Sequence, residues 1–100
     1  MTTNYVGLIV LTAYCSCSLC CQQFADGITA SGTKPVQGRT VAANWLPFGT
    51  RVYLDGVGWR TVEDRMAKRF SERVDVYFDS HKEALKFGIR TNKVWKVTNE

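Results

Sequence analysis

The sequence contains no apolar run long enough to cross a bilayer as a helix. Its main apolar run, Tyr5–Tyr14, has ten residues, about half of the roughly 20 that a membrane-spanning helix requires. A signal peptide is not indicated either, because Met1–Asn4 carries no positive side chain and no small-residue cleavage site follows Cys15. The Val, Ile, Tyr and Thr content of the run predicts a buried strand instead. If the protein acts outside the cell, its export route is not written in this sequence.

Histidine is scarce, and internal repeats and low-complexity tracts are absent from the sequence. The one histidine, His81, falls where a short helix is expected to begin, and we interpret it as a surface residue rather than a catalytic base. A chain of 100 residues with 45% hydrophobic content supports a single compact domain, residues 1–100, and leaves no room for a second. We expect it to act as a monomer and without a cofactor.

Acidic residues are outnumbered by basic ones. Thirteen Lys and Arg against nine Asp and Glu give a net charge of +4, which favours anionic partners. Bacterial wall polymers, nucleic acid and acidic membranes all qualify, and the charge excess does not choose among them. Four cations lie close together at Arg65, Lys68, Arg69 and Arg73. No aromatic stacking platform accompanies them in the sequence, so we do not expect nucleic-acid binding.

Four cysteines fall within seven residues in the pattern C-x-C-x-x-C-C, at Cys15, Cys17, Cys20 and Cys21. A tetrahedral zinc site usually takes its ligands from two separate segments, and four ligands this close would strain to surround the ion. We therefore expect disulfides in an oxidising compartment rather than a metal site. Three connectivities are possible, and a bridge between the adjacent Cys20 and Cys21 has the poorest geometry. Reduced thiols are the alternative for a cytosolic protein.

The most informative stretch sets acids into apolar, strand-like sequence. In segment 73–79 (RVDVYFD), apolar residues alternate with Asp75, Tyr77 and Asp79, which is the period of a strand with one face against a core. Asp75 should therefore lie on a rigid, partly buried element, where a carboxyl group resists ionisation and can serve as a general acid. The alternative is an ordinary strand with acids on its solvated face. Asp79 precedes the expected helix. We interpret it as a residue that caps this helix, and a catalytic role is the alternative.

Turn signals divide the rest of the chain into short elements. Asp55-Gly56 predicts a tight hairpin, and Ser80 to Glu83 has the spacing of a capping box before a short helix that ends at Gly88. The expected strands are Tyr5–Tyr14, Arg39–Ala43, Arg51–Leu54, Trp59–Val62, Val74–Phe78 and Lys93–Val97. A loop is expected at Gln22–Gly38, and a loop or one helical turn at Arg65–Arg73. A closed barrel accommodates six short strands best, because closure removes exposed edges. The predicted class is all-β with one short helix.

Several segments, taken together and in order, resemble one known family. They are Thr12–Tyr14, Ala25–Thr33, Gly38–Ala42, Leu46–Tyr53, Glu63-Asp64 and Val74–His81. The sequence is similar to the 3D domain, named for three aspartates, and to the related barrels of membrane-bound lytic transglycosylase A and the stationary-phase survival proteins. The match runs from Leu11 to Val97, nearly the whole chain.

The resemblance implies a six-stranded double-psi β-barrel whose groove holds a peptidoglycan glycan strand. The three family aspartates fall on Asp64, Asp75 and Asp79. In the transglycosylase relatives the aspartate that matches Asp75 is the acid and base, and the one that matches Asp64 lies close by in support. This agrees with the interpretation of Asp75 from its neighbours alone.

The activity that the resemblance implies is lytic transglycosylation. In this reaction the muramyl C6 hydroxyl attacks its own anomeric carbon. One carboxyl group can therefore protonate the leaving oxygen and then accept the hydroxyl proton, whereas a glycoside hydrolase normally needs two carboxyl groups. The product is a 1,6-anhydromuramyl end, and no metal is required.

One departure from the family pattern follows the first aspartate. The family has Thr-Gly-Gly there, and this sequence has Arg65-Met66-Ala67. A cation beside Asp64 would favour its ionised form and could contact substrate, together with Thr12, Ser31 and Thr33, which are expected to line the groove. Bulk in place of glycine could also reshape the groove so that it binds glycan without cleaving it. A non-catalytic glycan-binding module is therefore the alternative function.

The location implied by this function is extracellular or at the cell wall. A natural Met1 with no leader would fit a phage protein that reaches the wall during lysis. An excised domain with an added start methionine would read the same, and both interpretations stay open.

Overall fold

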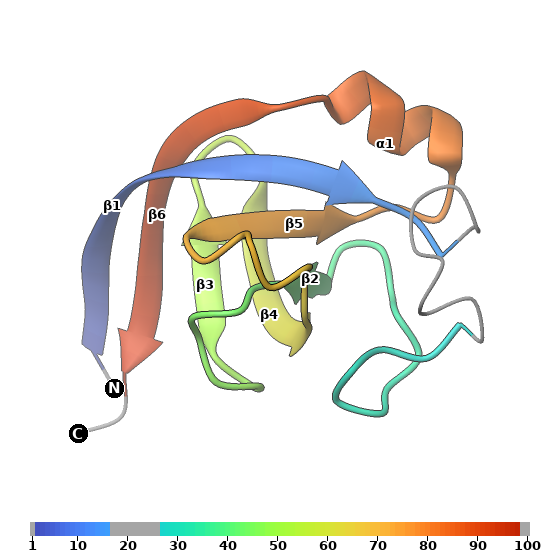
Figure 1. Cartoon of the computed structure of the whole chain (residues 1–100). Coiled ribbons are helices and arrows are strands. Elements are labelled where there is room, and N and C mark those ends of the chain that lie inside the picture. The colour runs from blue at the N-terminus through green and yellow to red at the C-terminus, as the bar shows by residue number, and fades with distance from the viewer. Residues whose placement is uncertain (1, 17–26, 99–100) are drawn as a thin grey trace.

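The computed structural model describes residues 2–16 and 27–98, in which strands are the dominant regular structure (Figure 1). The elements in chain order are β1 (Thr2–Tyr14), β2 (Thr40–Ala42), β3 (Arg51–Leu54), β4 (Gly58–Asp64), β5 (Arg73–Tyr77), α1 (His81–Phe87) and β6 (Arg90–Thr98). The predicted all-β class with one short helix is confirmed. The predicted hairpin is confirmed as well, because β3 pairs antiparallel with β4 across a turn in which Gly56 has a φ of 78°.

The six strands close into a barrel in the order β1-β5-β2-β4-β3-β6. β1 and β2 follow one another in the chain, yet β5 lies between them, parallel to β1 and antiparallel to β2. In the same way, β2 lies between the consecutive strands β4 and β5, parallel to the first and antiparallel to the second. Each trio is a psi motif, and the two motifs share β2 and β5. The barrel therefore has the double-psi topology that the family resemblance implied.

Aliphatic side chains fill the interior of the barrel. Alternation along each strand turns every second residue inward. The large strand residues with no exposed surface are Leu11, Val41, Val52, Leu54, Val62, Val74, Val76 and Val94. Because this core draws on all six strands, it holds the residues between these positions at fixed places on the outer face of the barrel.

Strand β1 is longer and more exposed than the sequence predicted. Its end, from Val10 to Tyr14, pairs with β5, whereas the residues before Val10 pair only with β6 and form a ribbon with it (Figure 1). A bulge between Tyr5 and Gly7 interrupts the ribbon, and Leu8 is 65% exposed. The prediction of a buried strand is therefore wrong for the first half of the apolar run, because that half does not pair with β5.

Helix α1 is capped as the sequence predicted. Ser80 is the N-cap and its hydroxyl accepts a hydrogen bond from the backbone N–H of Glu83, while Gly88 ends the helix with a φ of 67°. Ala84 and Phe87 are the buried residues of the helix. Within the described ranges, no helix has both the length and the apolar character needed to span a membrane.

Candidate functional site

Four residues from four adjacent strands form one row on the outer face of the barrel, which we call the acidic row. Thr12 pairs with Asp75, Asp75 with Ala42, and Ala42 with Asp64. Residues in register on neighbouring strands point to the same face. Asp64 and Asp75 therefore share a face with Ala42 between them, at a backbone separation of about two strand spacings, or roughly 10 Å.

The carboxyl group of Asp75 lies in an environment that favours its protonated form. Burial raises the pKa of Asp75 from its ordinary value of 3.8 to about 6, and the negative charge of Asp64 adds to the rise. The hydroxyl of Thr12 opposes it by donating a 2.9 Å hydrogen bond to Asp75 Oδ1, and the cation of Arg73 also lowers the pKa. The sequence-based expectation of a carboxyl group that resists ionisation agrees with this geometry.

The Thr12→Val variant is expected to raise the pKa of Asp75 above about 6, because it removes a hydrogen bond that favours the carboxylate. Titration of the Asp75 carboxyl carbon by NMR measures the change. Thr91→Val, at an exposed position of β6, is the matched control and should leave the titration unchanged. A lower pKa in Thr12→Val would mean that the hydroxyl does not stabilise the charged form.

Asp64 is 2% exposed, and its two oxygens are occupied by hydrogen bonds. Tyr14 Oη donates to Oδ2 at 2.9 Å, and the backbone N–H groups of Ala30 and Arg65 donate to Oδ1 at 2.9 Å each. These bonds join β1, the loop at 27–33 and the end of β4. Asp64 therefore links these three segments through hydrogen bonds and places a negative charge near Asp75. Little of its side chain is exposed to contact a ligand.

Asp79 is exposed and lies outside the acidic row, because β5 ends at Tyr77. Its backbone N–H donates to Gln37 Oε1 at 2.9 Å. The N-cap of α1 is the next residue, Ser80, so the interpretation of Asp79 as the cap is wrong by one position. The structure thus places two of the three aspartates that the resemblance singled out in one row and leaves the third at the helix start.

The loop at 27–33 carries hydroxyl groups to the Asp64 end of the acidic row. The Ser31 N–H donates to the Glu63 carbonyl at 3.1 Å, which fixes the loop on β4. The buried Thr29 hydroxyl lies 2.7 Å from that of Thr33 and 3.1 Å from that of Ser31. Ser31 is exposed and Thr33 is half-buried. Of the predicted groove residues, Ser31 therefore presents the more accessible hydroxyl.

The segment Arg65-Met66-Ala67 packs against the barrel instead of leaving the open turn that glycines would give. The Arg65 guanidinium donates to the Ala43 carbonyl at 2.8 Å and stacks 3.7 Å from the centre of the Phe48 ring. It reaches the backbone carbonyl of Asp64 at 3.4 Å, not the carboxylate. The expected charge contact between Arg65 and the Asp64 carboxylate is therefore absent from the described structure.

Met66 covers part of the face that carries the acidic row. Its side chain packs against a cluster of Tyr14, Ala42 and Tyr77. Ala42 is the residue between Asp64 and Asp75 in the row. An apolar side chain therefore lies where the family pattern has glycine, on the face that carries the candidate acid.

Sequence reasoning missed two residues that organise the site. Tyr14 donates to Asp64, and Glu63 accepts from Thr40 Oγ1 at 2.7 Å and forms an ion pair with Arg39, Nε to Oε2 at 2.9 Å. Both belong to segments that carry the family resemblance, but their partners lie on other strands. The signal for Glu63 in the sequence was a second acid directly before Asp64, at the end of strand-like sequence.

The cysteine prediction falls mostly outside the described residues, because Cys17, Cys20 and Cys21 lie there. Cys15 is described and is buried, with its Sγ 3.6 Å from Nδ1 of His81. His81 is half-buried beside this thiol, so its interpretation as a surface residue is wrong. In residues 2–16 and 27–98, no group of three or more His, Cys, Asp and Glu side chains is arranged to hold a metal ion.

The chain is similar to two proteins of Bacillus subtilis (strain 168) whose names refer to the cell wall. YabE, named as a cell wall shaping protein, is 28% identical over 99 residues, which are 98% of this chain and 24% of YabE. The cell wall-binding protein YocH is 32% identical over 79 residues, which are 74% of this chain and 27% of YocH. No family model matches the sequence. The chain spans about a quarter of the length of these relatives, and it is similar in sequence to parts of proteins named for the bacterial cell wall.

Proposed function

We propose that this barrel cleaves peptidoglycan as a lytic transglycosylase, with Asp75 as general acid and base. The observation that carries the proposal is a partly buried carboxyl group, fixed on a barrel strand, whose pKa burial raises to about 6. Such a group can give and take a proton within one catalytic cycle near neutral pH. The names of the two relatives support the cell wall as the place of action.

In the proposed reaction, protonated Asp75 donates its proton to the oxygen that links muramyl C1 to the next sugar, and the C1–O bond breaks. The C6 hydroxyl of the same muramyl residue attacks C1, and its proton passes to the Asp75 carboxylate. One C–O bond forms for the one that breaks, no water is consumed, and the aspartate returns to its protonated state. The products are a 1,6-anhydromuramyl end and a free hydroxyl on the departing sugar.

The placement of the other two aspartates favours this reaction over hydrolysis. Hydrolysis normally needs a second carboxyl group across the scissile bond, to activate water or to attack the sugar. Asp64 is buried with three donors on its oxygens, and Asp79 lies beyond the end of β5. An intramolecular hydroxyl nucleophile needs no such second carboxyl group.

Hydroxyl groups near the row are the proposed contacts for the glycan. Ser31 is exposed at the Asp64 end, and Thr33 lies beside it with its hydroxyl 3.4 Å from Glu63 Oε1. Thr12 holds the Asp75 carboxyl group in place through its hydrogen bond. Arg65, whose guanidinium is engaged with Ala43 and Phe48, is proposed to shape the groove rather than to pair with substrate.

The test is mass spectrometry of soluble products released from purified peptidoglycan at a pH near the pKa of Asp75. We expect 1,6-anhydromuramyl ends that carry no oxygen from labelled water. Reducing muramyl ends with one labelled oxygen would identify a hydrolase and contradict the proposed reaction. Intact glycan that nevertheless retains the protein would identify a binding module.

The binding module is the second candidate, and the packing of Met66 favours it. Met66 contacts the cluster that contains Ala42, so the surface beside Asp75 is more filled than a glycine turn would leave it. If this bulk keeps the glycosidic oxygen away from Asp75, the Met66→Gly variant should gain anhydromuramyl release that the parent lacks. Equal lack of product in both proteins would leave the groove as a binding surface only.

A further inference from the structure

A second surface feature lies on a different set of strands from Asp75. Four aromatic residues stand side by side on the outer face of β1, β6, β3 and β4, in the order Tyr5, Trp95, Tyr53 and Trp59, and we call them the aromatic row. Each is in register with the next. Asp75, by contrast, lies on β5 between β1 and β2. Both rows use β1 and β4, but near opposite ends of these strands, with Tyr5 and Thr12 on β1 and Trp59 and Asp64 on β4. The aromatic row is therefore separate from the acidic row.

The rings of the aromatic row form a continuous series. Their centroids are 5.3 Å apart for Tyr5 and Trp95, 5.8 Å for Trp95 and Tyr53, and 5.3 Å for Tyr53 and Trp59. Neighbouring rings are inclined by 54° to 64°. The two end residues are well exposed, Tyr5 at 54% and Trp59 at 42%. Cross-strand aromatic pairs stabilise a sheet, but that role does not require exposed rings at both ends.

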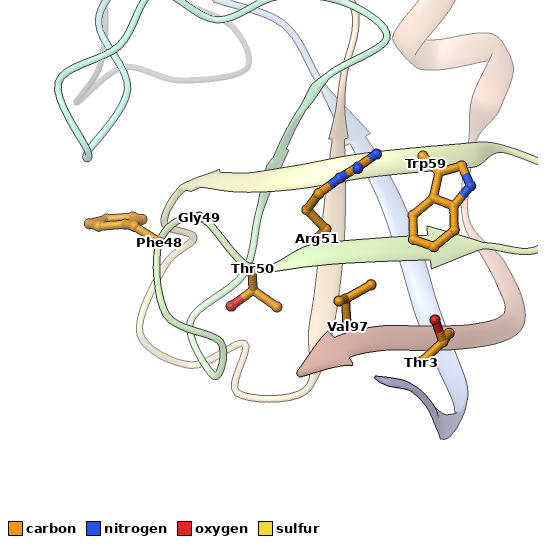
Figure 2. A pocket seen from close by; sticks show the side chains of 7 residues that line it. All are labelled: Thr3, Phe48, Gly49, Thr50, Arg51, Trp59 and Val97. Carbon is orange, nitrogen blue, oxygen red and sulfur yellow. The ribbon is translucent and has the colours of Figure 1, made fainter. Parts of the chain in front are cut away.

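Two hollows adjoin the aromatic row and share Thr3 and Trp59. One, of about 650 Å³, is bordered by the side chains of Thr50, Arg51 and Trp59, which Figure 2 shows on the same side of the barrel as Thr3. The other, of about 290 Å³, is lined by Thr3, Tyr53, Trp59 and Trp95. The described residues that line them include one cation, Arg51, and no acid. An aromatic surface with hydroxyls and a guanidinium at its margin has the composition of a binding site.

We propose that the aromatic row binds a single glycan strand of the cell wall, as a second site apart from Asp75. Pyranose rings have apolar C–H faces that pack on aromatic rings, and the ring spacing of the row is close to the repeat of an extended β-1,4-linked glycan. Rotatable glycosidic bonds let such a strand follow the twist of the row. Arg51 would pair with the lactyl carboxylate of a muramyl residue from which the stem peptide has been removed, because this carboxyl group is an amide where the peptide is attached. The choice of wall glycan as the ligand rests on the proposed function.

Single-stranded nucleic acid fits the aromatic row less well. Such ligands need a basic groove beside the stacking rings. Among the described residues that line the hollows, the only cation is Arg51, which itself stacks 5.1 Å from the Trp59 ring. The basic segment offers one aromatic ring and not a series of them: Arg69 and Arg73 both stack 4.6 Å from Phe70. That ring is covered by guanidinium groups on another part of the surface.

The binding test uses the full chain with Asp75→Asn, so that the glycan is not cleaved, and peptide-free glycan strands prepared from peptidoglycan with an amidase. The indole N–H signals of the three tryptophans are followed by NMR. We expect the signals of Trp59 and Trp95 to move with added glycan. Trp45 lies outside the row, and its Nε1 donates to the carbonyl of Arg73 at 3.0 Å, two residues before Asp75, so its signal reports on the region of Asp75 instead.

Substitutions at the two exposed ends of the row should weaken glycan binding. Tyr5→Ala and Trp59→Ala are each expected to lower the affinity roughly 2- to 10-fold, and the double variant on the order of 10- to 100-fold. Leu85→Ala, an exposed apolar position on α1, is the matched control and should bind as the parent does. Circular dichroism of each variant checks that the barrel is intact.

Three results would overturn the assignment. Glycan binding that leaves Trp59 and Trp95 unmoved would place the ligand elsewhere. Tighter binding of oligothymidylate than of glycan at these tryptophans would assign the row to nucleic acid. A dimer in light scattering that dissociates on Trp59→Ala would assign it to a second copy of the chain.

The failure of this inference can be told apart from failure of the proposed function. Peptidoglycan that yields no anhydromuramyl ends, while glycan strands still move the Trp59 and Trp95 signals, overturns the enzyme and supports the aromatic row. Anhydromuramyl ends without movement of those signals support the enzyme and overturn the row.

Discussion

The Asp75→Asn variant is expected to fold normally and to lose release of 1,6-anhydromuramyl ends. Asparagine keeps the shape of the side chain and can still accept the hydrogen bond from Thr12, but it has no proton to exchange with the glycosidic oxygen. General acid and base catalysis contributes about 10²- to 10⁴-fold to a rate, and Asp75 serves as both in the proposed cycle. We therefore expect a fall of at least about 10³-fold, measured as anhydromuramyl product per unit time.

The matched control for this variant is Asp55→Asn. Asp55 is an exposed carboxyl group in the β3–β4 turn, and Asn-Gly forms the same kind of turn as Asp-Gly. It removes one negative charge, as Asp75→Asn does, but at a site remote from the acidic row. Similar losses in both variants would trace the effect to net charge, and full activity in Asp75→Asn would remove the aspartate from the mechanism.

The same substitution should change the pH dependence of stability. The pKa of Asp75 is raised from its ordinary value of 3.8 to about 6, so the folded protein holds a proton that the unfolded chain releases. The free energy of unfolding of the parent therefore falls as pH rises through this window. Asp75→Asn lacks this loss and should be more stable than the parent by about 1–3 kcal/mol above pH 6, with no such gain below pH 4. Denaturant unfolding at both pH values measures it.

This pattern is the expected mark of a functional carboxyl group. Replacing a residue that is retained only for stability would lower the free energy of unfolding. A gain of stability together with a loss of product would mean that the fold maintains Asp75 at a free-energy cost for its chemistry. Loss of stability at neutral pH in Asp75→Asn would instead make the carboxylate a structural partner.

Local alternation made part of this site predictable from the sequence. Asp75 lies between two inward-facing valines, so its place on a rigid strand follows from a strand period of two. The same period puts Asp75 on the outer face, and its burial there comes from residues that cover this face. The helix cap at Ser80 and the turn at Gly56 are also local patterns, and both are present. In each case the interacting groups are within a few residues of one another.

The other features of the two surface rows depend on pairing between strands that are far apart in the sequence, which the sequence alone does not show. Asp64 takes its hydrogen bonds from residues 50 and 34 positions earlier, Tyr14 and Ala30, so no local pattern shows that its oxygens are occupied. The aromatic row likewise comes from four strands that meet only when the barrel closes. The family resemblance supplied the double-psi topology, but not these contacts.

Replacing Asp64 with alanine is expected to destabilise the protein by roughly 3–5 kcal/mol, because three buried or partly buried donors lose their acceptor at once. Tyr14→Phe removes one of these bonds and should cost about 1–2 kcal/mol. Both are measured by denaturant unfolding at neutral pH, with Asp55→Ala as the exposed control.

Asp64→Asn separates the charge of this residue from its hydrogen bonds. Its carbonyl oxygen can keep the two backbone donors, and the Tyr14 hydroxyl can turn to accept from the new amide, so we expect a cost below that of alanine. Because the charge of Asp64 helps to raise the pKa of Asp75, that pKa should fall in Asp64→Asn and the pH profile of product release should shift to lower pH. A large loss of stability with no movement of the profile would mean that Asp64 acts on the fold alone, whereas a shifted profile in a folded protein would show that the two aspartates are coupled across Ala42.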